Sequence, residues 1–242
     1  MKRKELIDHL NLYLEIEKFS DFGPNGLQVE GKEEVKKIAT AVSANLLTIE
    51  EAAKQGVDML IVHHGMFWAR DSYVVEEAKK KKLELLLEHG ITLAAYHLPL
   101  DGHQVVGNNW KAAQDLGWRN LEMFGDYGVQ GELEAIPIES FVKKLEEYYG
   151  HKAHAALFGK KEVRSATLIS GGAWREMLKT DTDCFITGNF DEPAWGWAQE
   201  RGMHFLALGH SATEQVGPKA LAKYIEEAHR LPAHFINIEN PF

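Results

Sequence analysis

The chain has 242 residues, of which 45% are hydrophobic and 26% charged, so it can bury a core and has the composition of a globular protein. Its 27 Lys and Arg against 36 Asp and Glu give a net charge of -9, which argues against general nucleic-acid binding because that needs a basic surface. The single cysteine, Cys184, excludes an intrachain disulfide and a thiolate zinc cluster. No apolar run approaches the ~18 residues of a membrane span, and polar residues interrupt what would be the apolar region of a signal peptide, so we expect a cytoplasmic protein with no membrane contact.

Strands and helices alternate through the first part of the chain. After an N-terminal amphipathic helix and the turn-forming segment 20–26, the run MLIV at 59–62 is typical of a fully buried strand in a parallel sheet. Thr48 and Glu51 predict a capping box at the start of a helix that Gly56 ends. The other predicted elements are strands at 37–43 and 91–96 and a helix at 75–88.

The same order recurs in the second part. It predicts strands at 166–170, 184–187, 204–208 and 233–238, and helices at 174–179, 194–201 and 218–229. Two tandem βαβαβ units predict an α/β fold, an interlocked sandwich with mostly parallel sheets. No linker separates them, so we predict one domain, 1–242, with halves of about 1–120 and 165–242. The connecting segment 121–164 should carry a helix at 138–149 and a strand near 155–158.

Side chains that bind metals follow three of the predicted strands. The second strand leads into His63 and His64, the third into His97 and Asp101, and the strand at 204–208 into His210 and Glu214. Ligands of doubly wound α/β proteins collect at the carboxyl ends of parallel strands, so we expect these side chains to meet.

Each position also has a purely structural interpretation. Adjacent strand residues point to opposite faces, so His63 and His64 should converge only if the backbone leaves strand geometry, which the following glycine permits. Asp101 lies in a segment typical of a turn, and Ser211 with Glu214 would make a capping box for the last helix. These interpretations must hold independently at three strand ends, whereas one metal site explains them together. We therefore favour metal binding.

The candidate ligands are imidazoles and carboxylates without a thiolate, a set that suits zinc, manganese, iron or cobalt. Five or six ligands exceed what one catalytic ion uses, so we predict two divalent ions per chain that share a bridging carboxylate. Such a centre has about two net positive charges, which favours a small anionic substrate and lowers the pKa of bound water toward neutrality.

The sequence gives less support to other kinds of catalytic site than to a metal centre. The sequence has no Walker phosphate loop, no G-x-G-x-x-G after a strand and no G-x-S-x-G nucleophile elbow. Gly171 and Gly172 follow a strand and could offer amides to a phosphate, although a tight turn is favoured. Cys184 lies in an apolar strand and is interpreted as a buried structural thiol, and Trp195 and Trp197 as packing or subunit-contact residues.

Four segments of the chain are distinctive. They are PNGLQVEG at 24–31, IVHHGMFW at 61–68, HLPLDGH with GNN at 97–103 and 107–109, and GHSATE at 209–214. Together they resemble the Nif-three-like family, whose members are often named GTP cyclohydrolase type two homologues. The resemblance runs from the first helix to the final strand and indicates a short bacterial-type member without the large inserted domain of longer relatives.

The resemblance implies a dinuclear metal centre and a toroidal homohexamer, a trimer of dimers. Asp101 is the expected bridging ligand and a catalytic residue, and His97 is expected to be a nearby catalytic residue that handles protons. The ligands that the resemblance implies are those already found at the strand ends: His63, His64, Asp101, His210 and Glu214.

One position departs from the family pattern. Many relatives carry Thr-Gly-Glu, followed by a histidine, where this chain has Thr187, Gly188 and Asn189. An asparagine amide cannot act as a base, so an acid–base role of that glutamate is not carried over to this chain. Asp191 and Glu192 are the candidates to substitute for it.

These features favour a dinuclear metal-dependent hydrolase of a nucleotide-like or other phosphorylated small molecule, with metal-activated water as the nucleophile. Ring opening of GTP is one such hydrolysis, but no residue in the motifs reads a guanine. The alternative is a non-enzymatic assembly that binds, delivers or senses metal.

Overall fold

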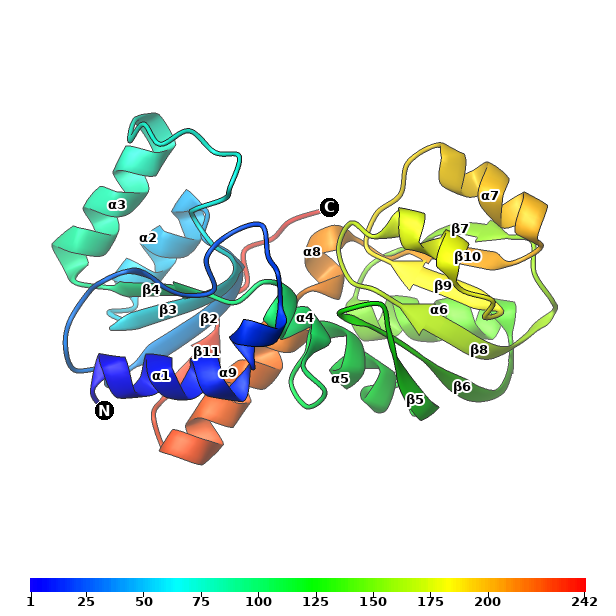
Figure 1. Ribbon diagram of the computed structural model, residues 1–242, viewed down its shortest axis with the longest axis horizontal. Helices are drawn as coiled ribbons and strands as arrows, with labels where there is room; N and C mark the ends of the chain where they lie inside the picture. The colour runs from blue at the N-terminus through cyan, green and yellow to red at the C-terminus, as the bar shows by residue number, and fades with distance from the viewer. The chain divides into compact units, whose positions relative to one another are not determined.

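Two separate sheets organise residues 1–242, all of which the computed structural model describes (Figure 1). The first sheet belongs to a unit of residues 1–106 and 217–239, and the second to a unit of residues 107–216 and 240–242. The chain returns to the first unit through helix α9 (Val216–His229) and strand β11 (Ala233–Phe235). The last predicted strand therefore pairs with the first sheet, although it follows the elements of the second.

The first sheet has the strand order β1-β4-β3-β2-β11. Its other strands are β1 (Gly26–Val29), β2 (Ile38–Ser43), β3 (Met59–His64) and β4 (Thr92–Ala95). All neighbouring pairs are parallel except β1 with β4. The strands predicted at 37–43, 59–62 and 91–96 are confirmed, and β3 extends two residues further, through both histidines.

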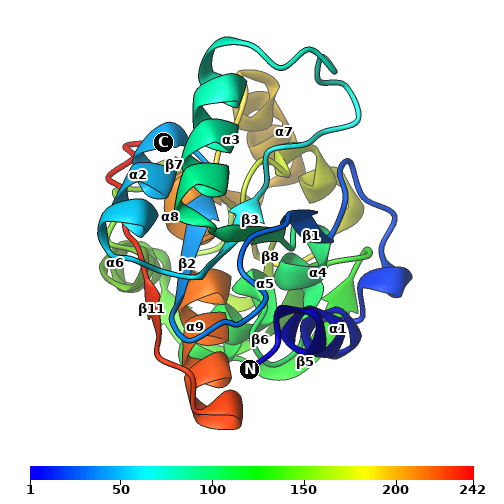
Figure 2. The ribbon, with the colours of Figure 1, turned by 90° about the vertical axis from the view of Figure 1, so that its left-hand side faces the viewer.

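Helices cover both faces of this sheet (Figure 2). Met59 and Ile61 are buried in a cluster with residues of α1 (Arg3–Tyr13) and α9. Leu60 and Val62 are buried in a second cluster with residues of α2 (Leu46–Lys54) and α3 (Glu77–His89). Because alternate strand residues enter opposite clusters, all four residues of MLIV are apolar.

The second sheet has the strand order β5-β6-β8-β9-β10-β7. Only β8 with β9 and β9 with β10 are parallel pairs, so this sheet is more antiparallel than the tandem pattern predicts. The added antiparallel strands come mainly from the predicted connecting segment. The bounds are β5 (Arg119–Phe124), β6 (Gly128–Pro137), β7 (His154–Leu157), β8 (Glu162–Leu168), β9 (Cys184–Thr187) and β10 (His204–Ala207).

Helices also pack on both faces of the second sheet. Residues of α5 (Asn108–Asp115) and α6 (Ile138–Tyr149) join one buried cluster, and residues of the 3-10 helix η2 (Trp174–Lys179) and of α7 (Pro193–Arg201) join the other. The remaining short helices are η1 (Ile16–Lys18), α4 (Leu98–Gly102) and α8 (His210–Thr213). Two sheets with interleaved helices confirm the α/β class.

The predicted cap of α2 is wrong. The helix begins at Leu46, and the N-cap is Asn45, whose side-chain oxygen accepts a hydrogen bond of 2.8 Å from the Thr48 N–H. Asn is a better N-capping residue than Thr, and Asn45 directly precedes the helix, so its side-chain oxygen reaches the N3 amide.

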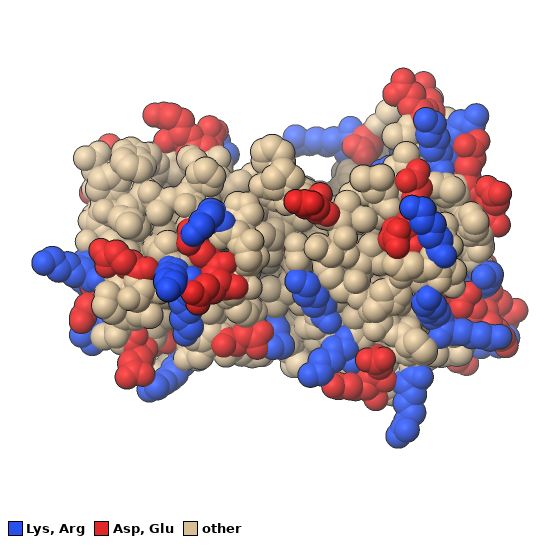
Figure 3. Space-filling view, turned by 180° about the vertical axis from the view of Figure 1, so that it is seen from behind, with Lys and Arg blue, Asp and Glu red and all other residues tan.

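Charged side chains of both signs are interspersed on the face shown in Figure 3, where Lys and Arg do not gather into one basic patch. None of the helices is both long enough and apolar enough to span a bilayer.

The α1 helix offers a test of the first unit's core. Leu10 is 0% exposed, so Leu10→Ala should lower the free energy of unfolding by about 2–5 kcal/mol through lost burial and a residual cavity. Leu12 on the same helix is 79% exposed, and Leu12→Ala should change it by less than about 0.5 kcal/mol. Urea unfolding followed by circular dichroism measures both, and equal losses would contradict this packing.

Candidate metal centre

Three histidine rings come together at the carboxyl end of the first sheet. His63 and His64 end β3, and His97 follows β4. The ring centroids lie 4.6 Å apart for His63 and His64, 5.0 Å for His63 and His97, and 5.5 Å for His64 and His97. One ligand nitrogen from each ring lies within 4.8 Å of the others, so this group can hold a metal ion.

The expectation that the chain must leave strand geometry for His63 and His64 to converge is wrong. Both residues remain in β3, and the pairing of β3 with β4 ends at Val62 and Ala95. The two histidines therefore extend past the last paired residue of β4, where their rings can turn toward the same edge of the sheet.

Each of the three rings has its Nδ1 atom close to a protein oxygen. The distances are 3.2 Å from His63 to the Tyr96 carbonyl, 3.1 Å from His64 to the Ser43 hydroxyl, and 2.7 Å from His97 to the Asp21 carboxylate. Carbonyls and carboxylates accept hydrogen bonds, so His63 and His97 carry a proton on Nδ1, and Nε2 of each ring is the nitrogen that can bind a metal or accept a proton. This is the usual arrangement of histidines that bind metals.

Asp21 orients His97, and sequence reasoning missed it. Its carboxylate also accepts hydrogen bonds from the Asn25 side chain and from the N–H groups of Phe22 and Leu98. Asn25 in turn accepts a hydrogen bond from the His97 N–H. Burial would raise the pKa of Asp21, but the hydrogen bonds from His97, Asn25 and Leu98 and the charge of His97 lower it to about 2.

Asp101 lies within α4 rather than in the predicted turn. Its side chain is 6% exposed, and Oδ2 lies 3.7 Å from His63 Nε2. The structure therefore brings this carboxylate to the histidine group, as expected for side chains that follow neighbouring parallel strands.

His210 and Glu214 lie together in the second unit. Glu214 directly follows α8, its side chain is 3% exposed, and its Oε1 lies 3.1 Å from His210 Nε2. The capping-box alternative is wrong, because Ser211 lies inside α8 and α9 begins only at Val216. The pair offers an imidazole and a carboxylate as possible metal ligands.

The turn after β8 packs against this pair. Gly171 has a φ of +66°, and a Cβ atom there would lie 2.3 Å from Glu214 Oε1 and 3.2 Å from His210 Nε2. Its N–H donates to the Thr213 hydroxyl at 3.1 Å, and its carbonyl accepts from the Asn189 N–H at 3.1 Å. The favoured turn interpretation is confirmed, and only glycine leaves room for the carboxylate.

Asn189 lies beside the same pair. A Cβ atom at Gly172 would be 3.2 Å from Asn189 Oδ1 and 3.6 Å from His210 Cε1. The position at which this chain departs from the family pattern therefore borders a candidate ligand. Asp191 and Glu192 are exposed, and the Asp191 carboxylate accepts a hydrogen bond from the Glu192 N–H.

Cys184 is completely buried, and burial raises the pKa of its thiol, which agrees with its interpretation as a structural residue. Trp197 packs against Trp174 with ring centroids 5.1 Å apart, whereas Trp195 is 56% exposed.

Known proteins are similar to this chain in sequence and fold over its whole length. The sequence profile of the Duf34/NIF3 (NGG1p interacting factor 3) family matches residues 1–241. A protein of Chlamydia trachomatis serovar D named "GTP cyclohydrolase 1 type 2 homolog" is 48% identical over 251 residues, which cover 100% of both chains. TTHA1606 from Thermus thermophilus is 34% identical with a TM-score of 0.96, and protein ybgI is 38% identical with a TM-score of 0.95, each over 100% of both chains.

Replacement of Asp21 should remove a contribution to stability that depends on pH. A carboxylate whose pKa falls from 3.8 to about 2 on folding stabilises the fold above pH 4, by about 2 kcal/mol, and loses that contribution as the pH falls toward 2. Asp21→Asn should therefore unfold more easily than the wild type at pH 7, and the difference should shrink by about half at pH 3. Urea unfolding at both pH values measures this, with the exposed Asp126→Asn as control. A difference that grows on acidification would contradict the hydrogen-bonded carboxylate.

Gly171→Ala should weaken metal binding, because the new methyl group occupies the space of the Glu214 carboxylate. We expect a loss of affinity of at least about tenfold, as when other partners of metal ligands are changed. Gly150 is the matched control, since its φ is +64° and no atom lies within 4 Å of an added Cβ. Gly150→Ala carries the same backbone strain and should keep the wild-type affinity in zinc titrations against a competing chelator. Equal affinities in the two variants would show that Gly171 does not make room for a ligand.

Proposed function

This chain belongs to the Duf34/NIF3 (NGG1p interacting factor 3) family, and from that premise we propose that it is a dinuclear metal-dependent hydrolase. Its substrate would be a nucleotide-like or other phosphorylated small molecule. The observation that carries the proposal is the convergence of the proposed ligands His63 and His64 with His97. Each ring has Nδ1 close to a protein oxygen, and one nitrogen of each ring lies within 4.8 Å of the others.

Both units would contribute ligands to the centre. The first would supply His63, His64 and Asp101, and the second His210 and Glu214. Three imidazoles and two carboxylates suit zinc, manganese, iron or cobalt, and five ligands are more than one catalytic ion uses. Two such ions would stabilise developing negative charge and lower the pKa of a bound water.

The residues around these ligands have separate roles in the proposal. The Tyr96 carbonyl fixes the proton of His63 on Nδ1, so that Nε2 is the ligand atom. Asp21 fixes His97 in the same tautomer, so His97 Nε2 can accept a proton during the reaction. Two divalent ions and two carboxylates leave about two positive charges, which favours an anionic substrate over a neutral one.

One observation supports an alternative function, that of a non-enzymatic metal-binding, metal-delivery or regulatory assembly. Asn189 lies beside His210 at the position where many relatives are expected to carry a glutamate, and its amide cannot take up a proton. The homohexamer that the family resemblance implies is compatible with either function.

Metal content tests the centre itself. Metal-replete protein should hold two ions per chain after desalting, and His64→Ala or Glu214→Ala should reduce this number while circular dichroism stays unchanged. His229→Ala and His234→Ala are controls that should keep both ions, because neither residue is among the proposed ligands. Elemental analysis that finds no more than one tightly bound ion per chain would defeat the dinuclear proposal.

The same preparations test the hydrolase against the alternative. Metal-loaded protein should hydrolyse at least one compound in a screen of phosphoesters and nucleotides, and Asp101→Ala should abolish that turnover. Reversible metal exchange without any turnover would favour the binding assembly.

A further inference from the structure

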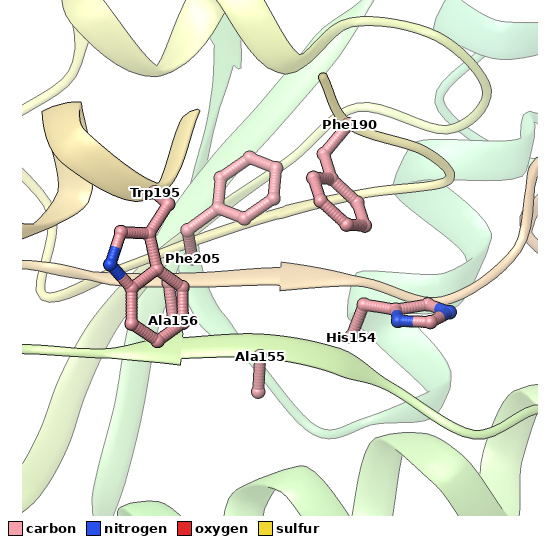
Figure 4. A pocket seen from close by; sticks show the side chains of 6 residues that line it. All are labelled: His154, Ala155, Ala156, Phe190, Trp195 and Phe205. Atoms are coloured by element: carbon pink, nitrogen blue, oxygen red, sulfur yellow. The ribbon is translucent and has the colours of Figure 1, made fainter. Parts of the chain in front are cut away.

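A cavity of about 160 Å³ opens in the second unit at the edge of its sheet (Figure 4). In Figure 4, Trp195 and His154 lie on opposite sides of it. The ring centroids of His154 and Phe190 are 5.5 Å apart, and those of Phe190 and Phe205 are 6.3 Å apart. The cavity is lined by His154, Ala155, Ala156, Phe190, Trp195 and Phe205.

Strand register explains why the cavity is there. Ala156 pairs with Phe205 and His154 with Ala207, so these residues share the face of the sheet on which α7 packs. Because β7 is the edge strand, its small alanine lies at the border of that helical layer. The space above Ala156 is walled by Phe190 and Trp195 instead of being filled by a larger side chain.

The aromatic walls are unusually accessible. Phe190 is 45% exposed and Trp195 is 56% exposed, so both forgo much of the hydrophobic stabilisation that burial would give. The Trp195 ring is nevertheless oriented, because it makes an edge contact with Phe158 at a centroid distance of 5.0 Å. Exposed, oriented aromatic rings around a cavity are typical of a site that binds flat ligands.

The cavity lies at the same end of the sheet as His210 and Glu214. Phe190 directly follows Asn189, whose N–H is bonded to the Gly171 carbonyl in the turn that packs on Glu214. His154 pairs with Ala207, and the three residues from there to His210 span at most about 11 Å. One molecule with a ring at one end and a phosphate at the other can therefore reach both places.

We propose that this cavity binds the planar heteroaromatic ring of the substrate, a nucleobase, by stacking against Phe190 and Trp195. The proposal rests on the proposed function in one respect, namely that the anionic end of the same molecule lies at His210 and Glu214. The flat aromatic walls favour a ring over an aliphatic chain, and the His154 imidazole can exchange hydrogen bonds with polar ring atoms.

Nucleosides test the ring site without the metal centre, because they carry no phosphate. Titration calorimetry of the protein as purified should show saturable binding of guanosine or adenosine and no binding of ribose. Trp195→Ala should weaken nucleoside binding by about tenfold or more, which is the usual effect of losing one stacking partner. Ala156→Met, which fills the cavity, should weaken it as well. Tyr73→Ala removes an aromatic residue that is 95% exposed and lies outside the cavity, and should leave binding unchanged.

Three results would overturn the assignment. They are equal binding of ribose and nucleosides, nucleoside binding that survives both Trp195→Ala and Ala156→Met, and absence of nucleoside binding together with a smaller particle for Trp195→Ala in light scattering. The last result would make the cavity a contact between copies of this chain.

Turnover, measured beside nucleoside binding, separates this proposal from the proposed function. Nucleoside binding without any turnover by the metal-loaded wild type would defeat only the hydrolase, and turnover without nucleoside binding would defeat only the ring site.

Discussion

Hydrogen bonds to histidine Nδ1 atoms are the constraint on which the candidate centre depends. A buried imidazole must be hydrogen-bonded, and the oxygen that binds Nδ1 also decides which nitrogen can bind a metal. Tyr96 directly follows β4, and Asp21 lies in the loop before β1. Both strands must therefore be in place before His63 and His97 are oriented. The tautomers of the site are a consequence of the first sheet's topology.

In the second unit the corresponding constraint is space. The Thr213 hydroxyl accepts from the Gly171 N–H and donates to the Gly209 carbonyl at 2.9 Å, so it joins the turn after β8 to the segment after β10. That close approach brings the main chain against Glu214, and a side chain at position 171 would displace the carboxylate. The position of Glu214 thus depends on the absence of a side chain at Gly171.

Buried apolar runs made most strands predictable from the sequence, whereas contacts between residues far apart in the sequence could not be predicted. MLIV marks β3 because both of its faces are covered, and the amphipathic pattern at 138–149 gives the bounds of α6. The side-chain hydrogen bond between Asp21 and His97 joins residues 76 positions apart, and no periodicity marks an aspartate in a turn-forming segment. The sheet that β11 joins was hidden for the same reason, since its pairing with β2 is set by the fold and not by local sequence. The histidines and carboxylates could be found because they follow strands that the sequence does reveal.

Residues beside the ligands, rather than the ligands themselves, distinguish one reaction from another on a shared fold. Asn189 can exchange hydrogen bonds with a substrate but cannot take up a proton near neutral pH. His97 has what proton transfer requires, namely a side chain that is 19% exposed, a carboxylate on Nδ1 and two neighbouring candidate ligands. If the chain is the hydrolase proposed above, proton transfer therefore belongs to the first unit. The segment of Asn189 and Phe190 then serves to bind and position the substrate, so specificity and proton transfer reside in different units.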